Sequence, residues 1–263
     1  MDENFEFPLE EIKKHFADGV KIFAFTHASN VLGNIYPAKE ICRLSREYGV
    51  YTVLDGAQAV PHFKVNVQSL DCDFYAFSGH KMLGPSGIGV LYVRRELFEK
   101  FSPFKFGGGM IDVVTETDAT WAHPPEKYEA GTPNIAGAVG LAAAARYLES
   151  IGLDNIREHE IEITKYALQQ LQQIPNISIL GSKNPENRTG IVSFTIKNIH
   201  AHDIASILNV HGVCVRSGHH CTMPLHTSLN LAATVRASYY LYNSTHDIDM
   251  LVVGLKKALE ILV

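Results

Sequence analysis

Cysteine and tryptophan are scarce in this sequence, with four and one among 263 residues. No two cysteines have the Cys-x-x-Cys spacing, which argues against a paired zinc motif and a dense disulfide framework. Cys42, Cys72 and Cys214 stand among apolar or helix-forming neighbours, and we predict that they are small buried residues. Cys221 differs, because it stands in a polar segment among histidines.

Excess positive charge and long apolar runs are also missing. The net charge of −5 gives neither a basic footprint for nucleic acid nor a polybasic patch for a membrane surface. The longest apolar stretch, 136–145, is interrupted by glycine and is too short to cross a bilayer. The sequence begins with acidic residues, unlike a secretory signal. We therefore expect a cytoplasmic protein that binds neither nucleic acid nor membrane.

Short apolar strands alternate with helices in the first half of the sequence. We predict helices at 9–16 and 38–48, and strands at 21–25, 51–54, 74–77 and 89–93. This alternation is typical of an α/β fold with a mostly parallel sheet, whose functional residues lie at strand ends.

The second half follows a different pattern. Residues 102–134 are rich in glycine, proline and threonine, and we expect an irregular segment that shapes a site or an interface. Helices are predicted at 135–149, 155–173, 201–211 and 246–262, and strands at 177–180, 191–196, 213–216 and 234–238. We therefore expect a large domain over 1–149 and a smaller α+β domain over 150–263.

Lys81 stands in a turn of small and polar residues directly after the strand expected at 74–77. A partly desolvated lysine in such a place can attack a carbonyl, although a solvated loop lysine gives the same pattern. Asp55 follows the strand expected at 51–54, where its carboxylate can keep a pyridinium nitrogen protonated or cap the next turn. An aspartate and a lysine at two strand ends form the minimal pair for pyridoxal phosphate.

Six segments together resemble a known family. They are 26–33 (THASNVLG), 55–58 (DGAQ), 78–81 (SGHK), 128–134 (YEAGTPN), 215–221 (VRSGHHC) and 235–238 (VRAS). They resemble the class V aminotransferase superfamily of pyridoxal-phosphate enzymes and, within it, the group II cysteine desulfurases and related selenocysteine lyases. The motifs occur in family order along the whole chain. The resemblance implies the fold-type-I transferase fold.

The resemblance also implies how the cofactor would be held. Lys81 would bind it covalently and move protons at the substrate carbon. Asp55 would pair with the pyridine nitrogen, Asn30 and Gln58 with the phenolic oxygen, and Ser78 and His80 with the phosphate. Thr132 would reach the phosphate in a neighbouring protomer, which implies a homodimer.

Substrate and sulfur would be handled by the C-terminal motifs. By resemblance, Arg236 would bind the substrate carboxylate with its bidentate fork, and Arg216 matches a second arginine of the site. Cys221 would take the sulfur of L-cysteine as a persulfide and release alanine; selenocysteine is the alternative substrate. Such enzymes supply iron–sulfur cluster assembly through a small sulfur-acceptor protein. Independently, His219, His220 and Arg216 place polar or positive groups near Cys221, the environment of a reactive thiol.

A metal site is the competing interpretation of the histidines around Cys221, with His226 as a further candidate ligand. Adjacent residues rarely bind one ion well, and no second cluster completes a coordination shell. We therefore expect no metal site.

The N-terminal part departs from the family pattern. In the family, a section before the segment at 21–33 carries a glycine- and threonine-rich phosphate turn at a helix start, and a histidine that stacks on the cofactor. Neither has a counterpart here, so we expect an incomplete large domain. The functional hypotheses are therefore a cysteine desulfurase, a non-catalytic fragment acting as a binding or dimerisation partner, and a selenocysteine lyase or other class V enzyme.

Overall fold

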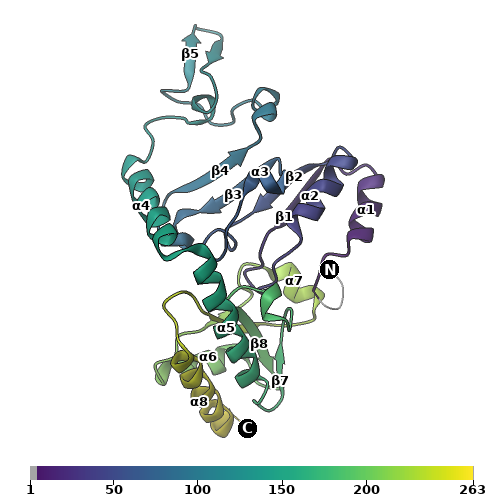
Figure 1. Cartoon of the computed structure of the whole chain (residues 1–263), viewed down its shortest axis with the longest axis vertical. Coiled ribbons are helices and arrows are strands. Elements are labelled where there is room, and N and C mark those ends of the chain that lie inside the picture. The colour runs from purple at the N-terminus through teal and green to yellow at the C-terminus, as the bar shows by residue number, and fades with distance from the viewer. Residues whose placement is uncertain (1–4, 263) are drawn as a thin grey trace.

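The computed structural model describes residues 5–262, which form two four-stranded sheets flanked by helices (Figure 1). Two long consecutive helices, α4 (Ile135–Ile151) and α5 (Leu153–Leu171), run from one sheet to the other. Gly152 separates them with a φ of 92°, a backbone conformation that favours glycine. Among the described residues, no helix is long and apolar enough to cross a membrane.

The first sheet has the strand order β1-β2-β3-β4. The strands are β1 (Ile22–Thr26), β2 (Tyr51–Asp55), β3 (Phe74–Ser78) and β4 (Gly89–Val93). β1, β2 and β3 are parallel and β4 is antiparallel, so the sheet is mostly parallel as predicted. Asp55 pairs with Thr26 on one side and with Ala76 on the other. The carboxyl ends of the three parallel strands thus meet at one edge.

Three helices accompany this sheet: α1 (Leu9–Ala17), α2 (Ala38–Glu47) and α3 (Val67–Leu70). Their apolar residues recur at three- or four-residue spacing and face the sheet. The shared core contains, among others, Ile12, Phe16, Ile41, Leu44, Leu54 and Tyr75. The bounds of α1, α2 and the four strands agree with the predicted ones to within one residue.

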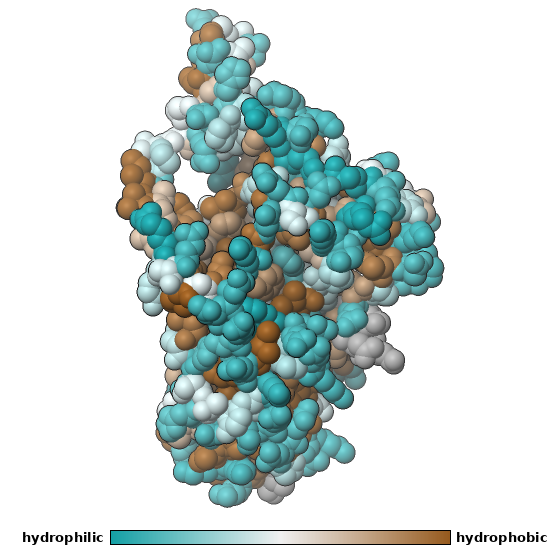
Figure 2. All heavy atoms as spheres, in the orientation of Figure 1, coloured by the Kyte–Doolittle hydropathy of each residue, from teal (hydrophilic) through white to brown (hydrophobic). Residues whose placement is uncertain are grey.

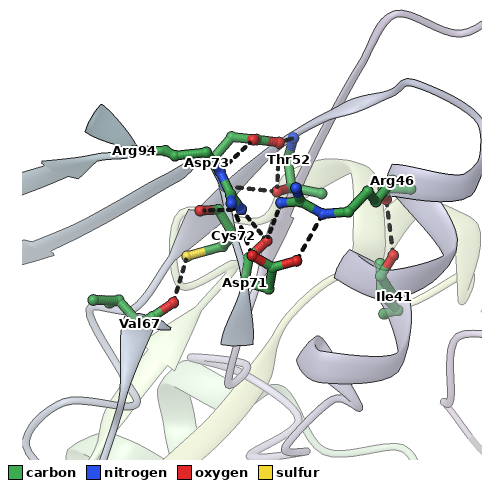
Figure 3. Close-up of polar contacts among 9 residues, drawn as sticks. Ile41, Arg46, Thr52, Val67, Asp71, Cys72, Asp73 and Arg94 are labelled. Carbon is green, nitrogen blue, oxygen red and sulfur yellow. Dashed lines mark hydrogen bonds and ion pairs between the residues drawn. The ribbon is translucent and has the colours of Figure 1, made fainter. Parts of the chain in front are cut away.

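A network of charges joins the starts of β2 and β3 to α2 and β4 (Figure 3). Asp73 accepts hydrogen bonds from the Thr52 amide at 2.8 Å and from Arg94 Nε at 3.0 Å. Asp71 pairs with Arg94 at 2.8 Å and with Arg46 of α2 at 2.7 Å. The network lies at the opposite edge of the sheet from Asp55. It therefore fixes the strands without occupying the edge where their carboxyl ends meet.

The segment between β4 and α4 is more ordered than its composition indicates. It contains the short helices η2 (Arg95–Lys100) and η3 (Glu126–Tyr128) and the antiparallel strands β5 (Ile111–Val114) and β6 (Ala119–Trp121). The expectation of an irregular 102–134 is wrong for this hairpin. Its turn is closed by backbone and side-chain bonds between Thr115 and Asp118, a local signal that the glycine-rich composition obscured. The hairpin projects beyond the sheet at the top of Figure 1.

The second sheet is antiparallel and has the order β7-β8-β10-β9. Its strands are β7 (Ile177–Ile179), β8 (Ile191–Ile196), β9 (Arg216–Gly218) and β10 (Thr234–Ser238), with η4 (Pro185–Asn187) before β8. Helices α5, α6 (Ala201–Val210) and α8 (Thr245–Leu262) share one apolar core with it.

Two predictions for this part of the chain are wrong. The strand expected at 213–216 begins only at Arg216, because pairing with β10 and not local hydrophobicity decides where β9 starts. The loop expected after it contains a short helix, α7 (Met223–Ser228), with proline in its first turn.

Large apolar side chains are exposed beside the first sheet. Ile135 and Val139 of α4 are 64% and 63% exposed, and Leu91 of β4 is 59% exposed. Figure 2 shows brown spheres over the start of α4. β4 is also the last strand of the sheet among the described residues, so one of its edges is unpaired. This part of the large sheet therefore presents the surface that an incomplete domain would expose.

Candidate active site

Most of the predicted cofactor-binding residues follow the carboxyl ends of β1, β2 and β3. Asn30 lies in the loop after β1, Asp55 ends β2, and Ser78 ends β3. Lys81 and His80 follow at once in the short helix η1 (Gly79–Met82). The three parallel strands therefore bring these residues to one edge of the sheet.

Asp55 takes the capping role that its position permits. Its Oδ1 accepts the amide hydrogen of Ala57 at 2.9 Å, which fixes the turn after β2. The residue is nevertheless exposed, so its carboxylate remains accessible at the edge of the sheet.

Lys81 is presented by a turn that has little room for change. A side chain at Gly79 would lie 2.8 Å from the Ile88 side chain, and one at Gly84 would lie 2.8 Å from the Gly79 carbonyl oxygen. Leu83 ends the short helix in the left-handed region with a φ of 64°. Lys81 itself is exposed. The sequence of small residues therefore builds a tight support that leaves the amine free.

Two arginines face each other across the strands β9 and β10. Arg216 and Arg236 are register partners, and Arg236 donates from Nη1 to the Asn30 carbonyl at 2.9 Å. Burial, followed by the charge of Arg216, lowers the pKa of Arg236. The Nε of Arg236 is buried, and no hydrogen-bond partner for it exists within residues 5–262. Two adjacent guanidinium groups with a free donor form a site for an anion.

Cys221 lies beside this arginine pair. Its Sγ is 3.9 Å from Arg216 Nη2, and the side chain is exposed. Both His220 and Cys221 have positive φ, 51° and 64°, so the loop is held in an uncommon conformation. The Asn30 amide donates to the His220 carbonyl at 2.7 Å and ties the thiol-bearing loop to the first sheet.

A buried group of polar side chains packs under the Cys221 loop. His220 Nε2 lies 2.9 Å from Thr234 Oγ1, and His226 Nε2 lies 3.1 Å from the same oxygen. Burial, with a smaller contribution from Arg236, lowers the pKa of His220 to about 4, which keeps the ring neutral. In the part of the chain that the structure describes, no group of three or more histidine, cysteine or acidic residues could hold a metal ion.

Gln58 and Thr132 are the remaining predicted cofactor-binding residues. Gln58 is half-buried in the turn after Asp55, and its Oε1 lies 3.2 Å from His62 Nε2. Thr132 is exposed before α4, and no hydrogen bond ties its side chain to the other predicted residues within 5–262.

Several polar residues near the site were not identified from the sequence. His62 and Glu160 form a buried pair under Gln58, and Arg188 is fully buried behind the loop of Asn30. His27 is buried against the Tyr75 hydroxyl, and burial lowers its pKa to about 4. The His62–Glu160 and His27–Tyr75 contacts join residues 98 and 48 positions apart, so the local sequence gives no sign of them.

The cysteines divide into two buried and two exposed residues. Cys42 and Cys72 are buried as predicted, and burial raises their pKa values to about 12 and about 11. Cys214 is exposed, so the prediction that it is buried is wrong. It precedes the first paired residue of β9, and its apolar neighbours Val213 and Val215 pack against the core instead.

We therefore expect two of the four thiols to react in the folded protein at pH 8. Cys221 and Cys214 are accessible, whereas Cys42 and Cys72 are both covered and held in the protonated form. Titration with a chromogenic disulfide should detect two thiols in the native unmodified chain and one in native Cys214→Ala. After unfolding, the unmodified chain should give four. Modification of Cys42 in the native chain as fast as Cys214 would contradict the buried assignment.

Comparison with known proteins places this arrangement in a family. The family model for aminotransferase class-V matches residues 1–251. A probable cysteine desulfurase of Halalkalibacterium halodurans is 50% identical over 252 residues, which cover 96% of this chain and 61% of that protein. This chain thus spans about three-fifths of that relative's length.

Solved structures give the same result. The apo structure of the cysteine desulfurase from Thermococcus onnurineus matches with a TM-score of 0.95 at 40% identity, covering 100% of this chain and 65% of that one. The cysteine desulfurase CsdA of Escherichia coli matches with a TM-score of 0.95 at 33% identity, with the same coverage. With its mostly parallel sheet and matching motifs, the chain belongs to the class-V aminotransferase family.

Proposed function

We propose that this chain carries the catalytic residues of a pyridoxal-phosphate-dependent cysteine desulfurase. The observation that carries the proposal is the exposed Cys221 thiol beside Arg216 and Arg236. A free amino acid with a sulfur-bearing side chain has the two features that this site fits, a carboxylate for the arginines and a sulfur for the thiol. The naming of the relatives as cysteine desulfurases supports the same substrate.

The residues at the sheet edge fit pyridoxal phosphate by their chemistry. They supply an amine for the aldehyde (Lys81), a carboxylate for the pyridine nitrogen (Asp55), an amide for the phenolic oxygen (Gln58), and a hydroxyl and an imidazole for phosphate (Ser78 and His80). When bound, pyridoxal phosphate supplies an electron sink for carbanion chemistry. Asn30 is a less direct candidate for the phenolic oxygen, because its amide already donates to His220.

The chain's own residues account for the remaining chemistry. Arg236 and Arg216 hold and orient the substrate carboxylate, and the Lys81 amine moves protons at the substrate carbon atoms. Cys221 Sγ forms an S–S bond with the substrate sulfur while the C–S bond of the substrate breaks. The bonding electron pair stays on that carbon, which takes a proton, so that alanine leaves and Cys221 keeps the sulfur as a persulfide.

Partners and location follow from the same proposal. The exposed thiol can be reached by a small sulfur-acceptor protein, as required for sulfur delivery to iron–sulfur cluster assembly. The exposure of Thr132 is compatible with its reaching the phosphate in a second protomer of a homodimer. We propose that the protein works in the cytoplasm, and that its domains divide near residue 150, next to the break between α4 and α5.

A second candidate function is that of a non-catalytic binding or dimerisation partner. It is favoured by the apolar side chains exposed over α4 and β4, which another polypeptide could cover. A selenocysteine lyase or another class V enzyme is the third candidate, since the arginine pair and thiol do not distinguish sulfur from selenium.

The test is to titrate the purified chain with pyridoxal phosphate, fix any visible absorbance band with borohydride, and map the modified residue. We expect the label on Lys81, and alanine together with persulfide on Cys221 after L-cysteine is added. Absence of the band would favour the binding partner, and alanine from selenocysteine alone would favour the lyase.

A further inference from the structure

A buried acidic residue lies under the candidate site without a role in the chemistry described so far. Glu160 of α5 is 0% exposed, and its Oε1 lies 2.5 Å from His62 Nδ1. Its Oε2 has no hydrogen-bond partner among residues 5–262. Arg157, one turn earlier on α5, is attracted to Glu160 electrostatically but donates its hydrogen bonds to backbone carbonyls. Among the described residues, His62 is therefore the only side chain that hydrogen-bonds the Glu160 carboxylate.

His62 connects this carboxylate to the site. The ring is buried, and its second nitrogen, Nε2, lies 3.2 Å from Gln58 Oε1. Tyr240 packs against the ring with its centroid 5.1 Å away, and its hydroxyl donates to the Pro61 carbonyl at 2.7 Å. The ring is thus held between Glu160 and Gln58 by neighbours on both domains of the fold.

The position of the imidazole protons decides what this chain of contacts does. A buried carboxylate with one unpartnered oxygen favours a proton or a positive charge beside it over a neutral imidazole that donates from Nδ1 alone. If His62 is an imidazolium, both ring nitrogens donate; if Glu160 holds the proton, Nδ1 accepts it and Nε2 still bears a hydrogen. In both cases Nε2–H points at Gln58, and the Gln58 amide must offer its oxygen to it.

We propose that Glu160 and His62 set the orientation of the Gln58 side chain, with its oxygen toward His62 and its NH2 group toward the site. An unrestrained glutamine amide presents a donor or an acceptor with nearly the same shape. A phenolic oxygen needs the donor. The inference rests on the proposed function only for what the NH2 group binds, and Glu160 and His62 act as positioning residues.

A contribution to stability alone does not account for this pair. Replacing a buried ion pair by apolar residues of similar volume is often neutral or stabilising, so its value for folding is small. Removing one partner is different, because it leaves an uncompensated buried charge. The two residues must therefore be replaced together if their effect on Gln58 is to be separated from unfolding.

The first experiment determines, in the cofactor-free chain, which nitrogen of the His62 ring bears a hydrogen. Long-range ¹H–¹⁵N spectra distinguish a protonated ring nitrogen from one with a lone pair, and His62→Gln assigns the signal. We expect Nε2 of His62 to bear a hydrogen. A lone pair on Nε2, with hydrogen only on Nδ1, would reverse the Gln58 amide and overturn the proposal.

The second experiment measures cofactor affinity by absorbance. His62→Phe combined with Glu160→Leu removes the restraint without leaving a buried charge, and Gln58→Glu keeps the acceptor for Nε2–H but loses the outward donor. Each should bind pyridoxal phosphate about tenfold more weakly, the loss of roughly one hydrogen bond to a charged group. The control is His159→Gln, which changes a half-buried histidine of the same helix. Its one hydrogen-bond partner among residues 5–262 is the Asn243 carbonyl.

The outcomes separate this proposal from the proposed function. Loss of affinity in the double variant, with the melting temperature of the unmodified chain retained, is a result that a merely structural pair would not produce. Equal affinity of the double variant and the unmodified chain would overturn the positioning role. If the unmodified chain binds no cofactor at all, the proposed function fails, and the ring-nitrogen spectrum still decides how Gln58 is oriented.

Discussion

Replacement of Cys221 by alanine is expected to abolish persulfide formation and to reduce alanine production from L-cysteine by about 10³-fold or more, the scale on which removal of a nucleophile acts. The substitution removes the only exposed thiol that lies beside the arginine pair, while the site for the carboxylate stays intact. Cofactor binding should be unchanged, because Lys81 and Asp55 belong to other elements. Alanine release and mass spectrometry of the persulfide measure the effect.

Cys214→Ala is the matched control for this prediction. Cys214 is also an exposed, free cysteine, and it stands seven positions earlier in the same part of the chain. The control should retain full activity. If Cys221→Ala released sulfide from cysteine at the unmodified rate, the assignment of the sulfur-accepting residue would be wrong.

Replacement of Lys81 by alanine should remove the visible absorbance band of the bound cofactor and its fixation by borohydride. Alanine production should also fall by roughly 10²–10⁴, because the amine that moves protons at the substrate carbon is missing. The fold should tolerate the change, since the Lys81 side chain is exposed and only the backbone takes part in the tight turn around Gly79. Absorbance spectra and thermal unfolding measure the two effects separately.

Lys39→Ala provides the comparison for Lys81, because Lys39 is an exposed lysine on α2 that lies outside the candidate site. It should leave the spectrum as it is. A band that persists unchanged in Lys81→Ala would place the cofactor lysine elsewhere in the chain.

The share of its relatives' length that this chain spans bears on both predictions. The chain spans 61% of the length of its relative from Halalkalibacterium halodurans, and no glycine-rich phosphate turn precedes β1 in its sequence. Ser78 and His80 are then the phosphate donors that we propose at the sheet edge. An added polypeptide that covers the exposed side chains of α4 and β4 should therefore raise cofactor affinity if it also supplies such a turn.

The sequence by itself determined most of the elements and the candidate positions for the chemistry. Apolar periodicity located α1, α2 and the first four strands, because a period of two or of about 3.6 is a local property of the chain. The order of motifs singled out Lys81, Asp55 and Cys221 as candidate site residues and indicated the family that the comparisons confirm. It also indicated that this chain spans only part of the family's length, as the 61% coverage of its relative shows.

The tertiary structure alone decided which distant residues meet. Arg216 and Arg236 become neighbours only through the pairing of β9 with β10, and Asn30 reaches His220 across 190 positions of the chain. His62 and Glu160 are 98 positions apart, and neither has a local pattern that predicts the other. The exposure of Cys214 depends likewise on where β9 begins to pair. Such contacts follow from strand pairing and from the packing of distant segments, which no local periodicity contains.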